Sequence, residues 1–114
     1  EVVKMMKLVM AIVHDIDGNN VINALSRQGY QATKLASTGG FLKAGNTTLM
    51  IGTDEENVYE VIDIIKDKCE KRKQTVVNPT AVSGIESTID PYPVEIDVGG
   101  ATIFVLNVEQ FEKA

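Results

Sequence analysis

A glycine-rich segment over residues 38–46 carries the residue types best suited to holding a small ligand. It contains two turn sequences, T-G-G at 38–40 and A-G-N at 44–46. Gly and Asn accept positive φ and let the backbone come close to a bound molecule. Phe41 and Leu42 lie between the two turns, where a surface loop usually has polar residues. Apolar side chains beside exposed N–H groups suit a flat ring attached to a phosphate. On loop chemistry alone, a tight hairpin connection remains the alternative.

The same segment matches the phosphate-binding P-loop only in part. The spacing from Gly40 to Gly45 and Thr47 is that of G-x-x-x-x-G-K-[ST], but Asn46 stands where the lysine belongs. The missing lysine removes the charge that meets the β- and γ-phosphates. The residues that follow, T-T-L-M-I, predict a strand and not the helix that a P-loop requires. The segment therefore does not predict an NTPase.

Polar side chains on the preceding strand could complete a ligand site. Gln31, Thr33 and Leu35 share one face of a strand by the two-residue period. An amide and a hydroxyl beside a glycine-rich loop can hydrogen-bond to phosphate oxygens or to a base edge. Without a ligand, the same residues would form an ordinary solvated edge of a sheet.

The remaining reactive side chains predict structure and not catalysis. Cys69 continues the apolar stripe of a helix, so we interpret it as a small core residue. His14 is the single histidine and has no partner at metal-ligand or nucleophile–base spacing. Asp15 and Asp17 are explained more simply as helix caps than as paired catalytic carboxylates. A basic cluster at the end of the second helix suits the helix C-terminus or, alternatively, attracts phosphate: Lys66, Lys68, Lys71, Arg72 and Lys73. We therefore expect no enzyme, no metal and no cofactor.

The bulk properties limit the partners. A length of 114 residues predicts one domain over 1–114, in which residues 1–5 are an extension or an expression remnant. The net charge of −5 argues against a nucleic-acid polymer as partner, although not against a single nucleotide. One cysteine suits a reducing compartment. The apolar N-terminal run lacks a cleavage site and is too short to span a bilayer, so we expect a cytoplasmic protein without membrane contact.

The order of elements predicts an α+β fold. Leu8–Val13 reads as a buried strand, followed by a helix that ends at Gly29. Two strands flank the glycine-rich loop, and a second helix follows a predicted capping box that begins at Thr53. Residues 72–90 lack a regular pattern. Residues 94–98 and 101–108 read as strands joined by a two-residue hairpin turn at Gly99-Gly100. The whole is a ferredoxin-like βαββαβ sandwich with an extra C-terminal hairpin strand.

Two long motifs carry a resemblance to a known family. They are T-K-L-A-S-T-G-G-F-L-K-A-G-N-T-T at 33–48, and P-Y-P-V-E at 91–95 together with V-G-G-A-T-I-F-V-L at 98–106. Both resemble the hallmarks of the PII-like cyclic-di-AMP receptors, which are small bacterial signal-transduction proteins. The resemblance runs from about residue 6 to residue 111.

This resemblance implies a PII-like homotrimer that binds cyclic di-AMP in the clefts between subunits. It implies a short T-loop over residues 38–45 and a long B-loop over residues 72–90, the reverse of the classical nitrogen-regulatory PII proteins. Phe41 and Leu42 would hold an adenine, and Asn46 would read its edge. The ligand-binding positions that it implies are Gly29, Gln31, Thr33, Gly40, Phe41, Leu42, Asn46, Gly52, Gly99 and Phe104.

Two of these positions depart from the family pattern and leave the ligand open. The family often has Asn where Gly29 stands and Arg where Gln31 stands. A neutral amide loses roughly half the strength of a charge-assisted bond to phosphate. A receptor for another adenine nucleotide is therefore an alternative, and so is a ligand-free trimeric adaptor. The downstream protein partner is unknown.

Overall fold

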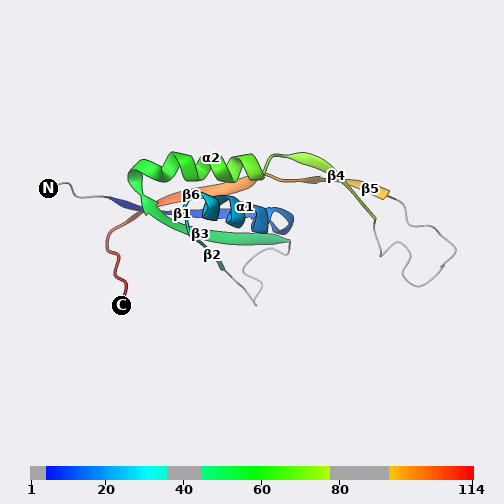
Figure 1. Ribbon diagram of the computed structural model, residues 1–114. Helices are drawn as coiled ribbons and strands as arrows, with labels where there is room; N and C mark the ends of the chain where they lie inside the picture. The colour runs from blue at the N-terminus through cyan, green and yellow to red at the C-terminus, as the bar shows by residue number, and fades with distance from the viewer. Residues whose placement is uncertain (1–4, 36–44, 78–92) are drawn as a thin grey trace.

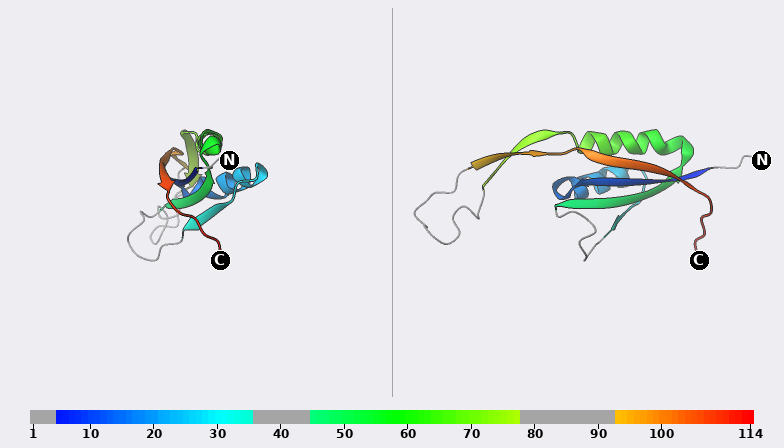
Figure 2. Two further views of the ribbon diagram at one scale, coloured as in Figure 1. Left: turned by 90° about the vertical axis from the view of Figure 1, so that its left-hand side faces the viewer. Right: turned by 180° about the vertical axis from the view of Figure 1, so that it is seen from behind.

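The computed structural model describes residues 5–35, 45–77 and 93–114. A four-stranded antiparallel sheet has the order β2-β3-β1-β6, and both helices pack on one of its faces (Figures 1 and 2). A separate two-stranded ribbon, β4-β5, projects from one end of the sheet. The elements are β1 (Met6–His14), α1 (Asp15–Arg27), β2 (Ala32–Leu35), β3 (Asn46–Asp54), a 3-10 turn (Glu55–Asn57), α2 (Val58–Lys68), β4 (Arg72–Val77), β5 (Pro93–Val98) and β6 (Ala101–Val108).

The core lies between the sheet and the helices. Alternate residues of the two central strands point toward the helices and are buried, because side chains alternate between the faces of a strand. The apolar stripes of α1 and α2 meet them, as the 3.6-residue period requires. The cluster consists of Val9, Ala11, Val13, Val21, Leu25, Leu49, Ile51, Val61, Ile65 and Cys69. The predicted α+β, ferredoxin-like fold and the predicted buried stripe of the second helix are confirmed.

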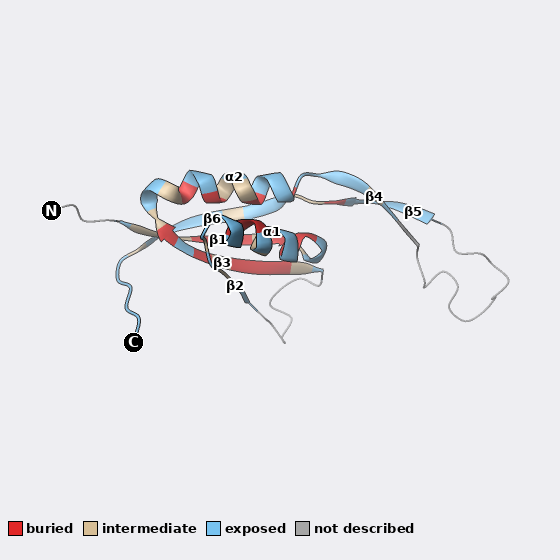
Figure 3. Cartoon of the chain, viewed as in Figure 1, coloured by how far each residue is buried: buried red, intermediate tan, exposed pale blue. Residues whose placement is uncertain are grey.

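Neither described helix covers the opposite face of the sheet, and we call this face the open face. Pairing in register puts Leu8 beside Leu106 and Met10 beside both Met50 and Phe104. Phe104 and Leu106 are 53% and 44% exposed, and much of β6 is solvent-accessible (Figure 3). Among the described residues, the open face thus presents exposed apolar side chains.

The end of α1 follows the prediction. Gly29 has a φ of +88°, its N–H donates to the Ser26 carbonyl, and the N–H of Tyr30 donates to the Leu25 carbonyl. This is the double hydrogen bond of a Schellman motif, for which glycine is the favoured residue.

The predicted helix caps are wrong. Helix α1 begins at Asp15 with His14 as N-cap, and no cap side chain bonds to the helix backbone. Thr53 belongs to β3, and a 3-10 turn with Asp54 as N-cap precedes α2. The carboxylates of Asp15 and Asp17 are bonded to other parts of the fold, which removes them from capping.

The predicted hairpin turn at Gly99-Gly100 is also wrong. Strand β5 pairs with β4, from Arg72 opposite Val98 to Val77 opposite Pro93, and β6 pairs with β1. Residues 72–77, expected to be part of an irregular loop, are therefore a strand. Gly99-Gly100 connects the ribbon to the sheet, which requires positive φ at both residues. Among the described helices, none has the length and apolarity to cross a membrane.

Candidate functional site

Three of the ten predicted ligand residues, Gly40, Phe41 and Leu42, lie outside the described residues. Two others stand at the entrance to β2. Gly29 lies in the turn after α1, and Gln31 immediately precedes the strand; both are exposed. A Cβ added to Gly29 would meet no atom within 4 Å, so open space surrounds it.

Four predicted ligand residues share the open face of the sheet. The register pairs Thr33 with Met50, Gly52 with Leu8, and Asn46 with His14. Phe104 pairs with Met10 from the other side of β1. All four therefore alternate with the buried core positions and point away from the helices.

The same register separates two of these residues across the width of the sheet. Thr33 lies on β2 and Phe104 on β6, which are the two edge strands. Three strand spacings separate them, about 14 Å. One adenine cannot contact both residues in a single chain, so the predicted set is incomplete as one site within one protomer.

A cavity at the junction of the sheet and the ribbon brings Asn46 and Gly99 together. We call it the junction cavity; its volume is about 290 Å³. Residues at one end of β1, β3 and β6 form one side of this cavity. The other side is formed by the ribbon root, which we define as Lys71, Gly99 and Gly100. The lining of the junction cavity consists of Ile12, His14, Asn46, Lys71, Gly99, Gly100, Ala101 and Thr102. A second cavity of about 550 Å³ adjoins it and shares His14, Lys71 and Gly99.

Gly99 holds the ribbon root tightly against the end of α2. Its φ is +99°, and a Cβ there would lie 2.2 Å from the carbonyl oxygen of Glu70. Its N–H donates to Nδ1 of His14 at 3.3 Å, and the N–H of Gly100 donates to the Cys69 carbonyl. Nδ1 of His14 thus accepts a hydrogen bond from the backbone of Gly99. The sequence offered no signal for this role of the histidine.

The first residues of α1 fix both sides of the junction cavity. On the β3 side, the N–H of Asp15 donates to the Gly45 carbonyl at 2.9 Å, and the Thr47 hydroxyl donates to the Asp15 carboxylate. On the ribbon side, Nη2 of Arg72 lies 2.6 Å from Oδ1 of Asp17, whose side chain is only 1% exposed. This hydrogen bond is the main reason that the pKa of Arg72 is raised. The two aspartates thus connect α1 to β3 and β4.

The basic residues predicted to form a cluster at the end of the second helix have different partners in the structure. Arg72 is bonded to Asp17, and Nζ of Lys73 lies 3.1 Å from the carboxylate of Asp97 across the ribbon. Lys71 lines both cavities and makes no ion pair within the described part of the chain.

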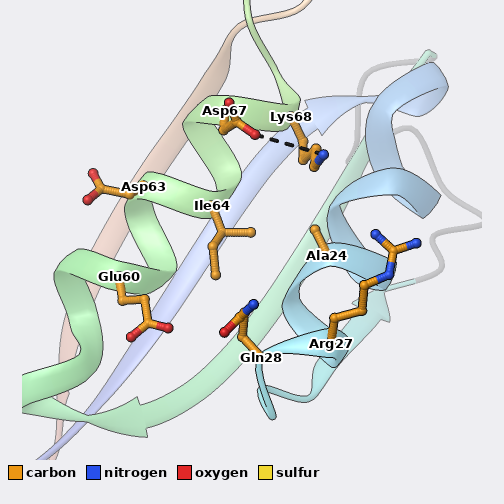
Figure 4. A pocket seen from close by; sticks show the side chains of 8 residues that line it. All are labelled: Ala24, Arg27, Gln28, Glu60, Asp63, Ile64, Asp67 and Lys68. Atoms are coloured by element: carbon orange, nitrogen blue, oxygen red, sulfur yellow. Dashed lines mark ion pairs between the residues drawn. The ribbon is translucent and has the colours of Figure 1, made fainter.

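A third cavity lies between α1 and α2, on the other side of the molecule from the open face. Figure 4 shows Ile64 directed into the space between the helices. The volume is about 560 Å³, and the lining consists of Ala24, Arg27, Gln28, Glu60, Asp63, Ile64, Asp67 and Lys68. None of the predicted ligand residues is among them. Three carboxylates against two cations make it unfavourable for an anionic ligand.

Neither a metal site nor an activated thiol emerges from the described residues. No group of three or more His, Cys, Asp or Glu side chains is placed there to hold a metal ion. Burial, with the nearby Asp17 carboxylate, raises the pKa of the Cys69 thiol from 9.0 to about 11.

We expect Cys69 to resist alkylation in the native protein, because the thiolate is the nucleophile. At pH 8, iodoacetamide should react only when the chain unfolds. Since the folded-state pKa is the higher one, the thiol also contributes stability below pH 9 that is lost between pH 9 and about 11. Mass spectrometry with and without urea measures the modification. Rapid labelling without urea would contradict the burial of this side chain.

Comparison with known proteins shows the family of the chain. The sequence profile of the cyclic-di-AMP receptor family matches residues 6–114. The chain belongs to the cyclic-di-AMP receptor family. Among solved structures it is similar to a functionally unknown protein from Pediococcus pentosaceus ATCC 25745, with 44% identity and a TM-score of 0.72 over 96% of this chain and 98% of that one.

The fold also extends to the PII proteins. Arabidopsis thaliana PII bound to citrate superimposes with a TM-score of 0.54 at 20% identity, over 91% of this chain and 78% of that one. At this identity the likeness shows the fold alone. This chain and the plant protein thus share a PII-like architecture, and membership of the cyclic-di-AMP receptor family supports a signalling role for this chain.

Proposed function

We propose that this chain is a receptor that binds cyclic di-AMP in the clefts between three copies of itself. The observation that supports this most directly is the position of the predicted ligand residues at opposite edges of the open face. Thr33 and Phe104 cannot contact one base within a chain. If copies meet through their open faces, Phe104 of one protomer comes near Thr33 of a neighbour, and the set becomes complete.

The apolar open face favours an oligomer independently of the ligand. Large apolar surfaces that remain uncovered on a small domain mark interaction sites. Leu8, Met10 and Met50 are only half-buried in the single chain, and Leu106 is exposed. Contact between copies through this face would cover them. The homotrimer is the assembly implied by the resemblance to the PII-like proteins.

We expect sedimentation equilibrium at micromolar concentration to give three times the chain mass of 12.4 kDa, with or without ligand. Leu106→Glu should shift the protein toward monomers, because it buries a carboxylate in the proposed interface. Tyr59→Glu is the matched control, since Tyr59 is 80% exposed on α2. A monomeric wild type would contradict the trimer and the intersubunit site together.

Within the cleft, the predicted residues have different roles. Phe41 and Leu42 pack against adenine, and Asn46 hydrogen-bonds to its edge. Gly40 and Gly52 offer backbone groups at close range. The entrance of β2 forms one boundary of the cleft, with Gly29, Gln31 and Thr33. Gly99 closes the cleft at the junction cavity.

The ligand would signal by ordering loops and not by being converted. Binding that favours one loop arrangement can create or hide a surface for a partner protein. The connections concerned are residues 38–45 and 78–92, between β2 and β3 and between β4 and β5. The trimer would work in the cytoplasm, where a cyclic dinucleotide and a reduced Cys69 coexist. Hydrogen exchange of both connections, with and without cyclic di-AMP, tests the ordering.

Isothermal titration calorimetry with cyclic di-AMP, cyclic di-GMP and ATP tests the function. We expect binding of cyclic di-AMP in preference to the other two. Preference for ATP would support a receptor for a different adenine nucleotide. Absence of binding by all three would support the ligand-free adaptor, and steady conversion of cyclic di-AMP to a linear product would indicate an enzyme.

A further inference from the structure

Lys71 brings a positive charge to the junction cavity. It follows α2 and precedes β4, and its exposed side chain lines the junction cavity together with Asn46 and Gly99. The aliphatic part passes over the ribbon root, since a Cβ added to Gly100 would lie 3.4 Å from Cε of Lys71.

The other two cations near this cavity are already paired. Arg72 is bonded to Asp17 and also donates to the Glu70 carbonyl at 3.0 Å. Lys73 is paired with Asp97. Within the described residues, Lys71 makes no ion pair, and the junction cavity has no carboxylate in its lining. Among the side chains placed there, Lys71 is the available positive charge.

A cyclic dinucleotide would bind more tightly with such a charge nearby. Its two phosphates carry one negative charge each, whereas three chains of −5 give a trimer of −15. Long-range electrostatics therefore oppose binding, and local donors must overcome this. Gln31 supplies no charge. Besides Lys71, the cavity offers the Thr102 hydroxyl, which can donate to a phosphate oxygen.

We propose that Lys71 binds a phosphate of the cyclic dinucleotide in the junction cavity and thereby supplies the cation that Gln31 does not. This rests on the proposed receptor function and adds to it a residue of the binding site. The phosphate lies beside Lys71 and Thr102, and Asn46 in the same lining remains available to the edge of the adenine. The charge reaches the site from the ribbon root and not from β2.

The test compares two neighbouring lysines by calorimetry with cyclic di-AMP. Lys71→Gln should weaken binding about fivefold to tenfold, because a charge-assisted bond to phosphate is lost. Lys73→Gln is the matched control: it removes the same charge two residues away but breaks only the exposed pair with Asp97. It should change affinity less than twofold. Lys71→Arg should retain most of the wild-type affinity.

Salt dependence gives a second, independent readout. The difference between wild type and Lys71→Gln should shrink as salt rises from 0.1 M to 1 M, where the screening length falls from about 10 Å to about 3 Å. Equal losses in the two glutamine variants would overturn the proposal, since they would report only net charge. Unchanged affinity in Lys71→Gln would also overturn it, while the receptor function would stand. A wild type that does not bind cyclic di-AMP would overturn the receptor function itself.

Discussion

Replacing Gly99 with alanine should destabilise the folded protein by about 2–5 kcal/mol, through backbone strain combined with overpacking. The φ of +99° is unfavourable for any residue with a Cβ, and the new methyl group would lie 2.2 Å from the Glu70 carbonyl oxygen. A backbone oxygen cannot move away as a flexible side chain can. The ribbon root would have to shift, and the hydrogen bonds from Gly99 to His14 and from Gly100 to Cys69 would be lost with it.

Gly29→Ala is the control that separates the two causes. Gly29 has a similar φ of +88°, but its added Cβ would meet no atom within 4 Å. It should therefore cost only the strain, about 1–3 kcal/mol. Urea unfolding followed by circular dichroism measures both variants at one protein concentration, because an oligomer has a concentration-dependent stability. Equal losses in the two variants would show that the contact with Glu70 does not limit this position.

The fold was predictable wherever the signal was local. The continuous apolar run at Leu8–Val13 predicted a buried strand, and the stripe from Val58 to Cys69 has the period of a helix packed on one side. Gly29 ended α1 as its backbone chemistry required. Each of these signals depends on neighbours within a few residues, so no knowledge of the tertiary structure was needed.

The errors arose where distant residues compete with local ones. Gly99-Gly100 has the composition of a hairpin turn, but strand β5 pairs with residues 72–77 and leaves β6 to pair with β1. Asp15 and Asp17 are of a residue type suited to N-caps. Their carboxylates instead accept hydrogen bonds from Thr47 and Arg72. Asp17 is almost fully buried, and a buried carboxylate requires a charged partner. The backbone N–H groups at a helix N-terminus do not supply that charge.

In the candidate site, too, the local motifs were informative and the contacts between distant residues could not be predicted. The motifs named Asn46 and Gly99 from residue type, and the structure places both in the lining of the junction cavity. Lys71 was visible only as one member of a run of basic residues. What distinguishes it from Arg72 and Lys73 is that these two are paired with Asp17 and Asp97, which lie far away in the sequence.

Replacing Phe41 with alanine should weaken the binding of cyclic di-AMP about tenfold or more. Base–aromatic stacking contributes on the order of 1–3 kcal/mol per base, and 1.4 kcal/mol corresponds to a factor of ten. Phe41 lies in the glycine-rich segment and outside the described residues, so the expectation rests on the motif. Calorimetry on the trimer measures it, with Tyr59→Ala as the control because that ring is exposed on α2, away from the open face.

The result also separates stacking from base recognition. Every base has a π-face, so Phe41→Ala should weaken the binding of any cyclic dinucleotide, whereas the amide of Asn46 can distinguish the edge of adenine from that of guanine. We therefore expect Asn46→Ala to reduce the preference for cyclic di-AMP over cyclic di-GMP, and Phe41→Ala to leave the preference largely intact. Undiminished affinity in Phe41→Ala would exclude the proposed adenine pocket. A wild type that binds both dinucleotides equally would exclude base reading by Asn46, and the contacts to phosphate at the junction cavity would then have to explain the binding.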